Sequence, residues 1–250
     1  MVVTVIIPVF NRPMEIRSAV ESVMRQACAL PLDILIVDDG STDETPEVLA
    51  ALATQDPRIR NIRRDNGGVT LARNTGLDAL LPQTQYVTFL DSDDLMAPDR
   101  FVRDLPILIE NPDLGLTYGD MVITFALDRK NLTVPHDAKQ QRLTSIHLAS
   151  CLYRRNLIDR IGRFDESLKM AEDTDYIFRT FEIGISFRQT DTICHYYLRH
   201  PGNMSSKLRD NQIWFARAIL RSVQRRRDDP TRTLVKPTFS IELQKDFFVS

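Results

Sequence analysis

The chain has 250 residues, of which 43% are hydrophobic and 26% are charged, with a net charge of −2 at neutral pH. This composition is ordinary for a folded domain, and the charge argues against bulk electrostatic binding of nucleic acid. Three widely separated cysteines, Cys28, Cys151 and Cys194, form no C-x-x-C motif, which disfavours a disulfide framework or a zinc site. No stretch approaches about 18 uninterrupted apolar residues and the N-terminus lacks a signal-peptide pattern, so we expect a cytoplasmic protein.

Strand and helix patterns alternate through the first 95 residues. Apolar runs rich in β-branched residues predict buried strands, and apolar residues at helical spacing predict helices between them. This alternation predicts an α/β fold with a mostly parallel sheet and helices on both faces. Strands are expected at 2–9, 33–37, 59–62 and 86–90. We expect one helix capped by Asn11, a second capped by Ser41 or Thr42 and ending at Leu52, and a third at 69–80.

Two glycine motifs of nucleotide-binding proteins are absent. No G-x-G-x-x-G follows the first strand, which disfavours a dinucleotide-binding Rossmann enzyme despite the similar architecture. No P-loop of the form G-x-x-x-x-G-K-[ST] occurs either. We therefore expect phosphates to be neutralised by a metal.

Residues 96–205 carry weaker patterns. The segment 128–143 is polar, and we expect a mobile loop over the site there. We expect helices at 98–110, 156–161 (closed by Gly162) and 176–183 (preceded by an acidic cluster), and strands at 115–125, 148–153, 186–189 and 192–197.

The composition changes after Ser206. An apolar stripe includes Ile213, Leu220 and Val223, and five arginines between 217 and 227 add positive charge. Such a helix lies on an anionic membrane surface, or it packs on its own domain or on a second subunit, and the sequence leaves these alternatives open. The first alternative would make residues 206–227 a peripheral contact at the inner face of the membrane.

Three carboxylates, Asp91, Asp93 and Asp94, directly follow the strand at 86–90. Like charges this close are unfavourable unless a cation lies among them, and hard oxygen ligands suit Mg²⁺ or Mn²⁺. In an open α/β sheet the ligand crevice lies outside the carboxyl ends of the strands, where this acidic cluster is expected. The alternative is a solvated loop in which Ser92 or Asp94 caps the next helix.

Five motifs follow one another along the chain: residues 5–12, 36–43, 66–68 with 72–76, 89–94, and 162–166 leading to 172–175. In this order they resemble the inverting nucleotide-sugar glycosyltransferases of family 2, which have the GT-A fold. The resemblance covers residues 2–205, and nothing in the chain matches the Q-x-x-R-W motif of the processive members. It implies a nucleotide-binding half at 1–95 and an acceptor-binding half at 96–205. Residues 206–250 lie outside it, and we expect them to form a separate C-terminal helical extension.

The resemblance also implies roles for single residues. A buried carboxylate such as Asp39 suits nucleotide binding because it accepts from an imide N–H or a ribose hydroxyl, whereas Asp38 reads equally as a turn residue. Arg73 would reach the base or the diphosphate, with a surface helix position as the alternative. The nucleotide-binding residues implied are Pro8, Val9, Asn11, Asp39, Arg73, Asp91 and Ser92.

The same resemblance places the metal and the base. Asp93 would hold Mn²⁺ or Mg²⁺, with Asp94 either a second ligand or a helix cap. His200 matches a histidine that some members place on the metal, although an isolated histidine is more often structural. Asp173 corresponds to the general base, and Glu172 orients the site or binds the acceptor; the alternative for both is simple helix capping.

The function implied is metal-dependent, inverting transfer of a sugar from a nucleotide diphosphate, with UDP favoured. The acceptor would be a hydroxyl of a saccharide or a lipid-linked glycan in surface polysaccharide synthesis. A nucleotide-sugar-binding module without turnover is the alternative. Phosphatases of the HAD fold carry D-x-D near the chain start, and sugar-phosphate nucleotidyltransferases begin with a glycine-rich segment, so both are disfavoured.

Overall fold

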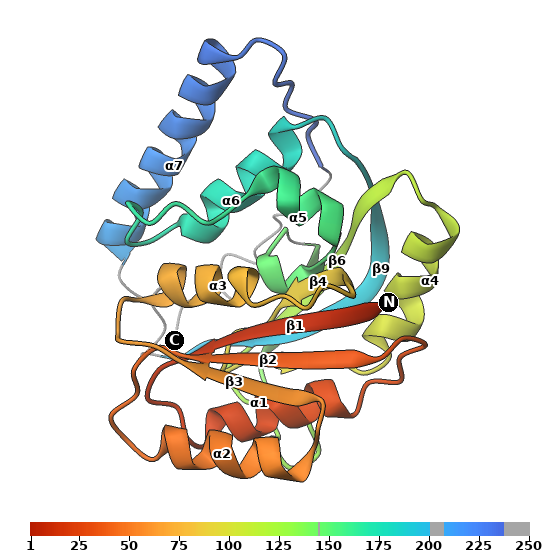
Figure 1. The fold of residues 1–250 in the computed structure, drawn as a ribbon, viewed down its shortest axis with the longest axis vertical. Helices are drawn as coiled ribbons and strands as arrows, with labels where there is room; N and C mark the ends of the chain where they lie inside the picture. Colours follow the sequence, from red (N-terminus) through yellow and green to blue (C-terminus); the bar gives the residue numbers. More distant parts are fainter. Residues whose placement is uncertain (145, 201–207, 238–250) are drawn as a thin grey trace.

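The computed structural model describes residues 1–144, 146–200 and 208–237. Within them, a nine-stranded sheet has the strand order β3-β2-β1-β4-β8-β6-β9-β5, with β7 paired to β6 (Figure 1). The strands are β1 Val2–Val9, β2 Leu32–Asp38, β3 Ile59–Arg63, β4 Thr84–Phe89, β5 Leu95–Met96, β6 Leu114–Thr124, β7 Gln140–Thr144, β8 Cys151–Arg154 and β9 Ser186–Leu198. The helices are α1 Glu15–Met24, α2 Thr45–Gln55, α3 Val69–Asp78, α4 Arg100–Glu110, α5 Arg155–Ile161, α6 Glu172–Glu182 and α7 Leu208–Asp228, with a 3₁₀ turn at Leu148–Ser150.

The N-terminal part is the predicted parallel unit. Strands β3, β2, β1 and β4 pair in parallel, with Val5 opposite Ile34 on one side and Thr88 on the other. Alternate residues face opposite sides of a strand, so Val5 and Ile7 pack with α1, α2 and α4, whereas Ile6 packs with α3, α5 and α6. Figure 1 shows α1 and α2 on one side of these strands and α3 on the other. The prediction of helices on both faces is confirmed.

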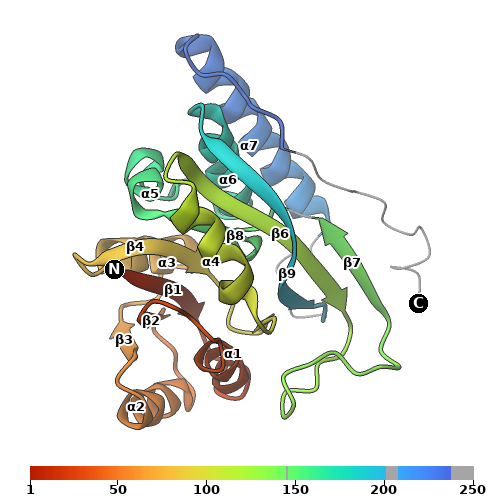
Figure 2. The same cartoon turned by 90° about the vertical axis from the view of Figure 1, so that its right-hand side faces the viewer.

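The second half of the sheet is mixed. β8 runs antiparallel to β4 and β6, β9 runs parallel to β6, and β5 runs antiparallel to β9. Figure 2 shows β6, β7 and β9 extending away from the parallel unit. Parallel pairing therefore dominates only up to β4, and the α/β class itself holds.

Three predictions for this half were wrong in detail. The strand expected at 148–153 begins only at Cys151, because residues 148–150 form a 3₁₀ turn. The strands expected at 186–189 and 192–197 are one strand, β9, which passes through irregular register opposite Gly119. A Cβ at Gly119 would lie 2.4 Å from the carbonyl oxygen of Thr192, so only glycine allows this approach. The expected loop at 128–143 ends early, because 140–144 forms β7.

Helix boundaries also differ from the expectation. Asn11 does not cap α1, which starts at Glu15; its backbone has φ +51° and its side chain contacts Thr42 instead. Neither Ser41 nor Thr42 caps α2, whose N-cap is Glu44. Helix α6 starts at Glu172 rather than 176, so the acidic cluster forms its first turn. Gly162 does close α5, with φ +80°.

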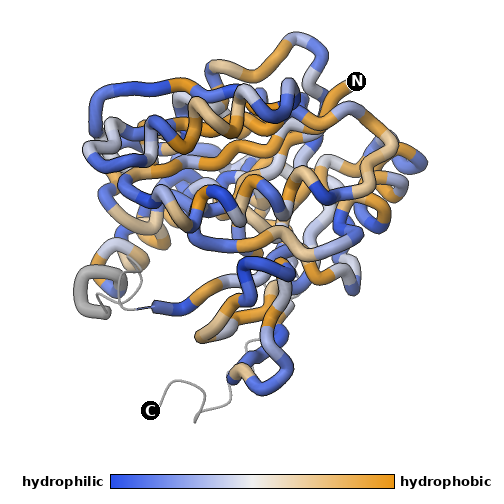
Figure 3. The backbone as a smooth tube through the Cα atoms, turned by 90° about the horizontal axis from the view of Figure 1, so that it is seen from below, coloured by the Kyte–Doolittle hydropathy of each residue, from blue (hydrophilic) through white to orange (hydrophobic). Residues whose placement is uncertain are grey.

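The apolar residues follow the interior strands, while most outer turns are hydrophilic (Figure 3). Helix α7 lies along the outside of α6 (Figure 1). Among the described helices, none is long and apolar enough to cross a bilayer. The expected boundary between residues 205 and 206 lies outside the described residues.

Candidate active site

A cleft of about 1020 Å³ opens at the carboxyl ends of β1, β2 and β4. This is the place where ligands bind in open α/β sheets. Asn11 does not line the cleft, and His200 reaches it only through its contact with Asp93. The other predicted site residues all line it: Pro8, Val9, Asp39, Arg73, Asp91, Ser92, Asp93, Glu172 and Asp173.

Asp39 fixes one wall of the cleft. Its buried carboxylate accepts backbone N–H bonds from Gly67 and Gly68, the latter at 2.6 Å, and pairs with Arg64. Gly68 has φ +92°, a backbone conformation that glycine adopts without strain. Asp39 therefore shapes the 66–68 turn in front of α3. Asp38 behaves as the turn residue that the sequence allowed, accepting from the backbone N–H of Ser41.

Arg73 joins two acidic groups across the cleft floor. Its guanidinium, only 4% exposed, donates to Asp91 Oδ1 at 2.9 Å and to Glu172 Oε1 at 2.5 Å. Burial raises the pKa of Asp91, but the attraction of Arg73 and of His147 and the hydrogen bond from Arg73 together outweigh burial and leave this pKa below its ordinary value. A position on the helix surface, one of the two readings of Arg73, is wrong. The guanidinium bridges α3, the end of β4 and α6.

Glu172 and Asp173 occupy the first turn of α6. Burial, aided by repulsion from Asp173 and opposed by Arg73, raises the pKa of Glu172 to about 7. Asp173 is half-buried, and its Oδ1 accepts from the backbone N–H of Thr174 at 2.6 Å. Of the two side chains, Glu172 is buried and hydrogen-bonded to Arg73, whereas Asp173 is the more exposed in the cleft.

Asp93 and His200 form a second polar cluster at the cleft, apart from the contacts of Arg73 with Asp91 and Glu172. Oδ2 of Asp93 lies 2.9 Å from Nε2 of His200 and 3.8 Å from Nη2 of Arg12. Arg129 donates to the backbone oxygen of Asp93 at 2.8 Å and thereby attaches the segment between β6 and β7 to the cleft. The structure thus brings together the two residues that were expected to hold a metal.

Asp94 is not the helix cap that was one of its expected roles. It is fully buried, its Oδ1 accepts from the backbone N–H of Leu198, and the N-cap of α4 is Asp99. Burial and repulsion from Asp93 raise its pKa well above the ordinary value. Asp94 therefore anchors the end of β9 beside the acidic cluster.

A divalent cation such as Mn²⁺ or Mg²⁺ needs several oxygen or nitrogen donors around one point. The described residues contain no group of three or more His, Cys, Asp or Glu side chains arranged to hold a metal. Asp93 and His200 supply one oxygen and one nitrogen donor side by side, a combination that Mn²⁺ accepts. These two residues fit a cation that shares its remaining ligands with phosphate oxygens and water.

Sequence reasoning missed several cleft residues. His147, which carried no signal, lines the cleft and stacks on His195 with ring centroids 5.2 Å apart. His195 is the strand residue that was predicted, and burial lowers its pKa well below the ordinary value. Tyr197 and Phe215 also line the cleft. No local pattern marks them, because β9 and α7 bring them to the cleft from the far end of the chain.

The strand order and the cleft at the carboxyl ends of the parallel strands define a domain of the GT-A fold. Residues 4–162 match the family described as "Glycosyl transferase family 2". The chain belongs to this family.

Similar proteins include the "Uncharacterized glycosyltransferase EpsJ" of Bacillus subtilis (strain 168), 28% identical over 220 residues, covering 81% of this chain and 62% of that protein. The chondroitin synthase of Pasteurella multocida (strain Pm70) is 28% identical over 223 residues, covering 84% of this chain and 22% of that protein. The chain thus spans less than two thirds of these relatives.

Two solved structures share the fold. S. aureus TarS 1-349 in complex with UDP-GlcNAc has a TM-score of 0.66 and 22% identity, covering 88% of this chain and 67% of that one. The mannosyltransferase PcManGT from Pyrobaculum calidifontis, in complex with GDP-Man and Mn²⁺, has a TM-score of 0.62 and 17% identity, covering 91% and 64%.

Proposed function

We propose that the protein transfers one sugar, with inversion, from a nucleotide diphosphate to a hydroxyl of a saccharide or lipid-linked acceptor. UDP is the nucleotide we favour, and synthesis of a polysaccharide or related glycan is the proposed task. One observation carries the proposal: the Asp91–Arg73–Glu172 bridge places the acidic end of β4 and the first turn of α6 in one cleft. The UDP-GlcNAc complex of TarS and the naming of the chondroitin synthase support the donor and the task.

We assign the binding of the nucleotide to Pro8, Val9 and Asp39. Asp93 and His200 would hold Mn²⁺ or Mg²⁺, which supplies positive charge that stabilises the diphosphate leaving group. The structure of PcManGT, which contains GDP-Man and Mn²⁺, supports a metal of this kind. Residues 1–95 would then form the nucleotide half of the cleft and residues 96–205 the acceptor half.

Asp173 is proposed as the base. Its carboxylate takes the proton of the acceptor hydroxyl as that oxygen attacks the anomeric carbon from the side opposite the diphosphate, so the configuration inverts. Glu172 is buried and donates no proton in its contact with Arg73, whose guanidinium it accepts from, and this contact suits it to orient the site. Both residues come from the first turn of α6, which fixes their spacing.

The test measures binding and turnover separately. UDP with Mn²⁺ is expected to raise the melting temperature, because a ligand of the native state stabilises it by mass action, and GDP, dTDP and CDP are compared in parallel. Asp93→Asn should remove the metal-dependent part of this shift, whereas Asp113→Asn, on the exposed surface outside the cleft, should not. The absence of a shift with every nucleotide would refute the donor site.

Turnover is followed as release of UDP from a panel of UDP-sugars. Asp173→Asn is expected to retain the UDP shift and to lose at least about 100-fold in rate, the usual contribution of a general base. Unchanged turnover in this variant would exclude Asp173 as the base. A wild-type chain that binds UDP without releasing it from any donor would favour the binding module.

A further inference from the structure

The outward face of α7 is apolar although the helix is well attached to the domain. Leu220 is 67% exposed and Ile213 47% exposed, while the small residues Ala218 and Ser222 are buried against the domain. This inverts the usual amphipathic arrangement, in which the apolar stripe faces the core. The outward face, as the name is used below, consists of Ile213, Ala216, Leu220 and Val223, which recur at three- and four-residue spacing.

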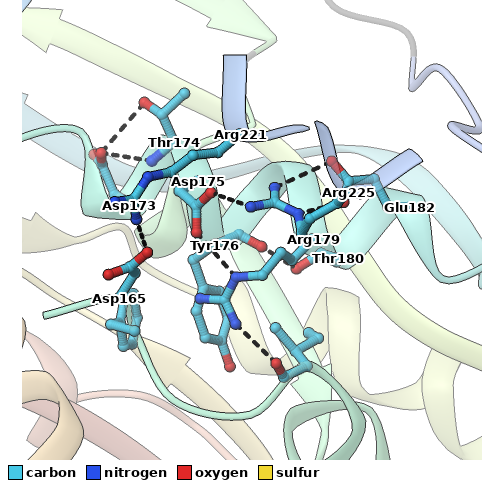
Figure 4. A network of polar contacts seen from close by, with 12 residues as sticks. Asp165, Asp173, Thr174, Asp175, Tyr176, Arg179, Thr180, Glu182, Arg221 and Arg225 are labelled. Atoms are coloured by element: carbon cyan, nitrogen blue, oxygen red, sulfur yellow. Dashed lines mark hydrogen bonds and ion pairs between the residues drawn. The ribbon is translucent and has the colours of Figure 1, made fainter. Parts of the chain in front are cut away.

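The attachment of α7 is polar. Arg225 contacts Asp175 and Glu182, and Arg221 contacts Asp165 (Figure 4) and Ser167. Two of the five arginines at 217–227 therefore point toward the domain. These contacts fix the rotation of the helix about its axis. They therefore also fix which side chains remain exposed.

Three arginines flank the outward face. Arg217, Arg226 and Arg227 form no ion pair with any carboxylate of the described residues; Arg217 stacks on Trp214 and Arg226 donates to a backbone oxygen of its own helix. Residues 212–227 contain no Asp or Glu at all. The face thus combines exposed apolar side chains with positive charge that no acidic residue of 212–227 offsets.

We propose that the outward face of α7 docks on an anionic lipid surface. A helix that lies in the interfacial plane needs an apolar strip for the acyl boundary and basic residues for the anionic headgroups. A second copy of the chain would bring three further unpaired arginines against these three, so charge complementarity favours lipid over a dimer.

Docking in this way would set the orientation of the cleft. Phe215, on the same helix, lines the cleft, so a lipid surface against α7 lies close to the acceptor side of the site. The docking surface goes beyond the proposed sugar transfer and does not depend on it. Its test accordingly uses no nucleotide and no sugar.

The test is co-sedimentation of the full chain with vesicles. Phosphatidylcholine with phosphatidylglycerol in equal parts is expected to bind the protein, in a salt-sensitive manner, and phosphatidylcholine alone is not. The double substitution Ile213→Ser with Leu220→Ser should weaken binding at least about tenfold, and Arg226→Gln with Arg227→Gln should weaken it to the anionic vesicles. Melting temperatures show whether each variant remains folded.

The control removes two exposed apolar side chains from another helix. Val102→Ser with Ile109→Ser on α4, where the wild-type residues are 51% and 45% exposed, should bind vesicles like the wild type. Equal loss in this control, equal binding to neutral vesicles, or no binding to anionic vesicles would overturn the proposal. So would a dimer, detected by light scattering, that the α7 double substitution converts to a monomer.

Discussion

At the residue scale, Arg73 determines the chemistry of the cleft floor. It lies between Asp91 and Glu172, and the contact to Glu172 spans 99 positions in the chain. The sequence marked all three residues as motif members, but a pair so far apart has no local signature. The motifs predicted that Arg73, Asp91 and Glu172 lie in the cleft, but they did not predict that Arg73 pairs with both carboxylates.

The raised pKa of Glu172 gives a pH prediction. In the folded protein this pKa is about 7, against an ordinary value of 4.5. Between these two pH values the native state holds the proton more tightly than the unfolded chain does, so the free energy of unfolding falls as pH rises from about 4.5 to about 7. Glu172→Gln removes this term, and we expect its stability relative to wild type to rise across that window by on the order of 1–3 kcal/mol.

Urea unfolding of both proteins at several pH values measures this difference, and subtraction cancels the contributions of the other titrating groups. Glu166→Gln is the matched control, because contacts with Arg163 and Asn74 lower the pKa of that exposed glutamate. Its difference from wild type should therefore not rise between about pH 4.5 and 7. A flat or falling difference for Glu172→Gln would show that Glu172 is already ionised below this window.

At the element scale, α7 holds the helix that carries the proposed base. Arg225 donates to Glu182 at 2.8 and 3.1 Å and to Asp175 at 2.7 Å, and both carboxylates are almost fully buried (Figure 4). Asp175 is also held by Arg179 at 3.0 Å. Some arginines of α7 therefore pair with carboxylates of α6, while others face solvent. The sequence alone did not separate these two groups.

Arg225→Gln should loosen this attachment. Two buried carboxylates lose a charged partner, so we expect a loss of about 2–4 kcal/mol in the free energy of unfolding. The single tryptophan, Trp214, lies on α7, so its fluorescence in urea reports the same change directly. Arg227→Gln, an exposed position on the same helix, should stay within about 0.5 kcal/mol of wild type. Equal stability of the two variants would mean that the ion pairs of Arg225 contribute nothing.

Strands with an apolar pattern of their own could be predicted from the sequence, whereas strands that depend on a neighbouring strand could not. β1, β2 and β4 were recognisable because each is buried on both faces and reads as one apolar run. β9 was read as two strands because Thr190 and Asp191 interrupt its pattern, yet pairing with β6 continues past them. β5 has only two residues and exists because β9 lies beside it. Such elements depend on their partners, which the local sequence does not reveal.

At the scale of the whole molecule, the two halves of the cleft share their cores. One cluster joins Val5 of β1 to Leu152 of β8, and another joins Ile6 of β1 to Tyr153 of β8 and Tyr176 of α6. β4 and β8 are joined by only two residue pairs, so backbone pairing alone connects these strands weakly. Side-chain packing across that junction, together with the contact between Arg73 and Glu172, therefore holds residues 1–95 and 96–205 together.

This packing predicts that residues 1–95 and 96–205 unfold together, although they have different proposed roles. Leu152→Ala, at a fully buried position of the second half, should lower the stability of the whole chain by about 2–5 kcal/mol. In urea, far-UV and near-UV circular dichroism should show one coincident transition in both proteins, moved to lower urea in the variant. Leu220→Ala, which removes the same atoms from an exposed leucine, should leave the free energy of unfolding within about 0.5 kcal/mol of wild type. Two separate transitions, with only the second moved by Leu152→Ala, would mean that each half has an independent core and that the cleft forms between two separately stable units.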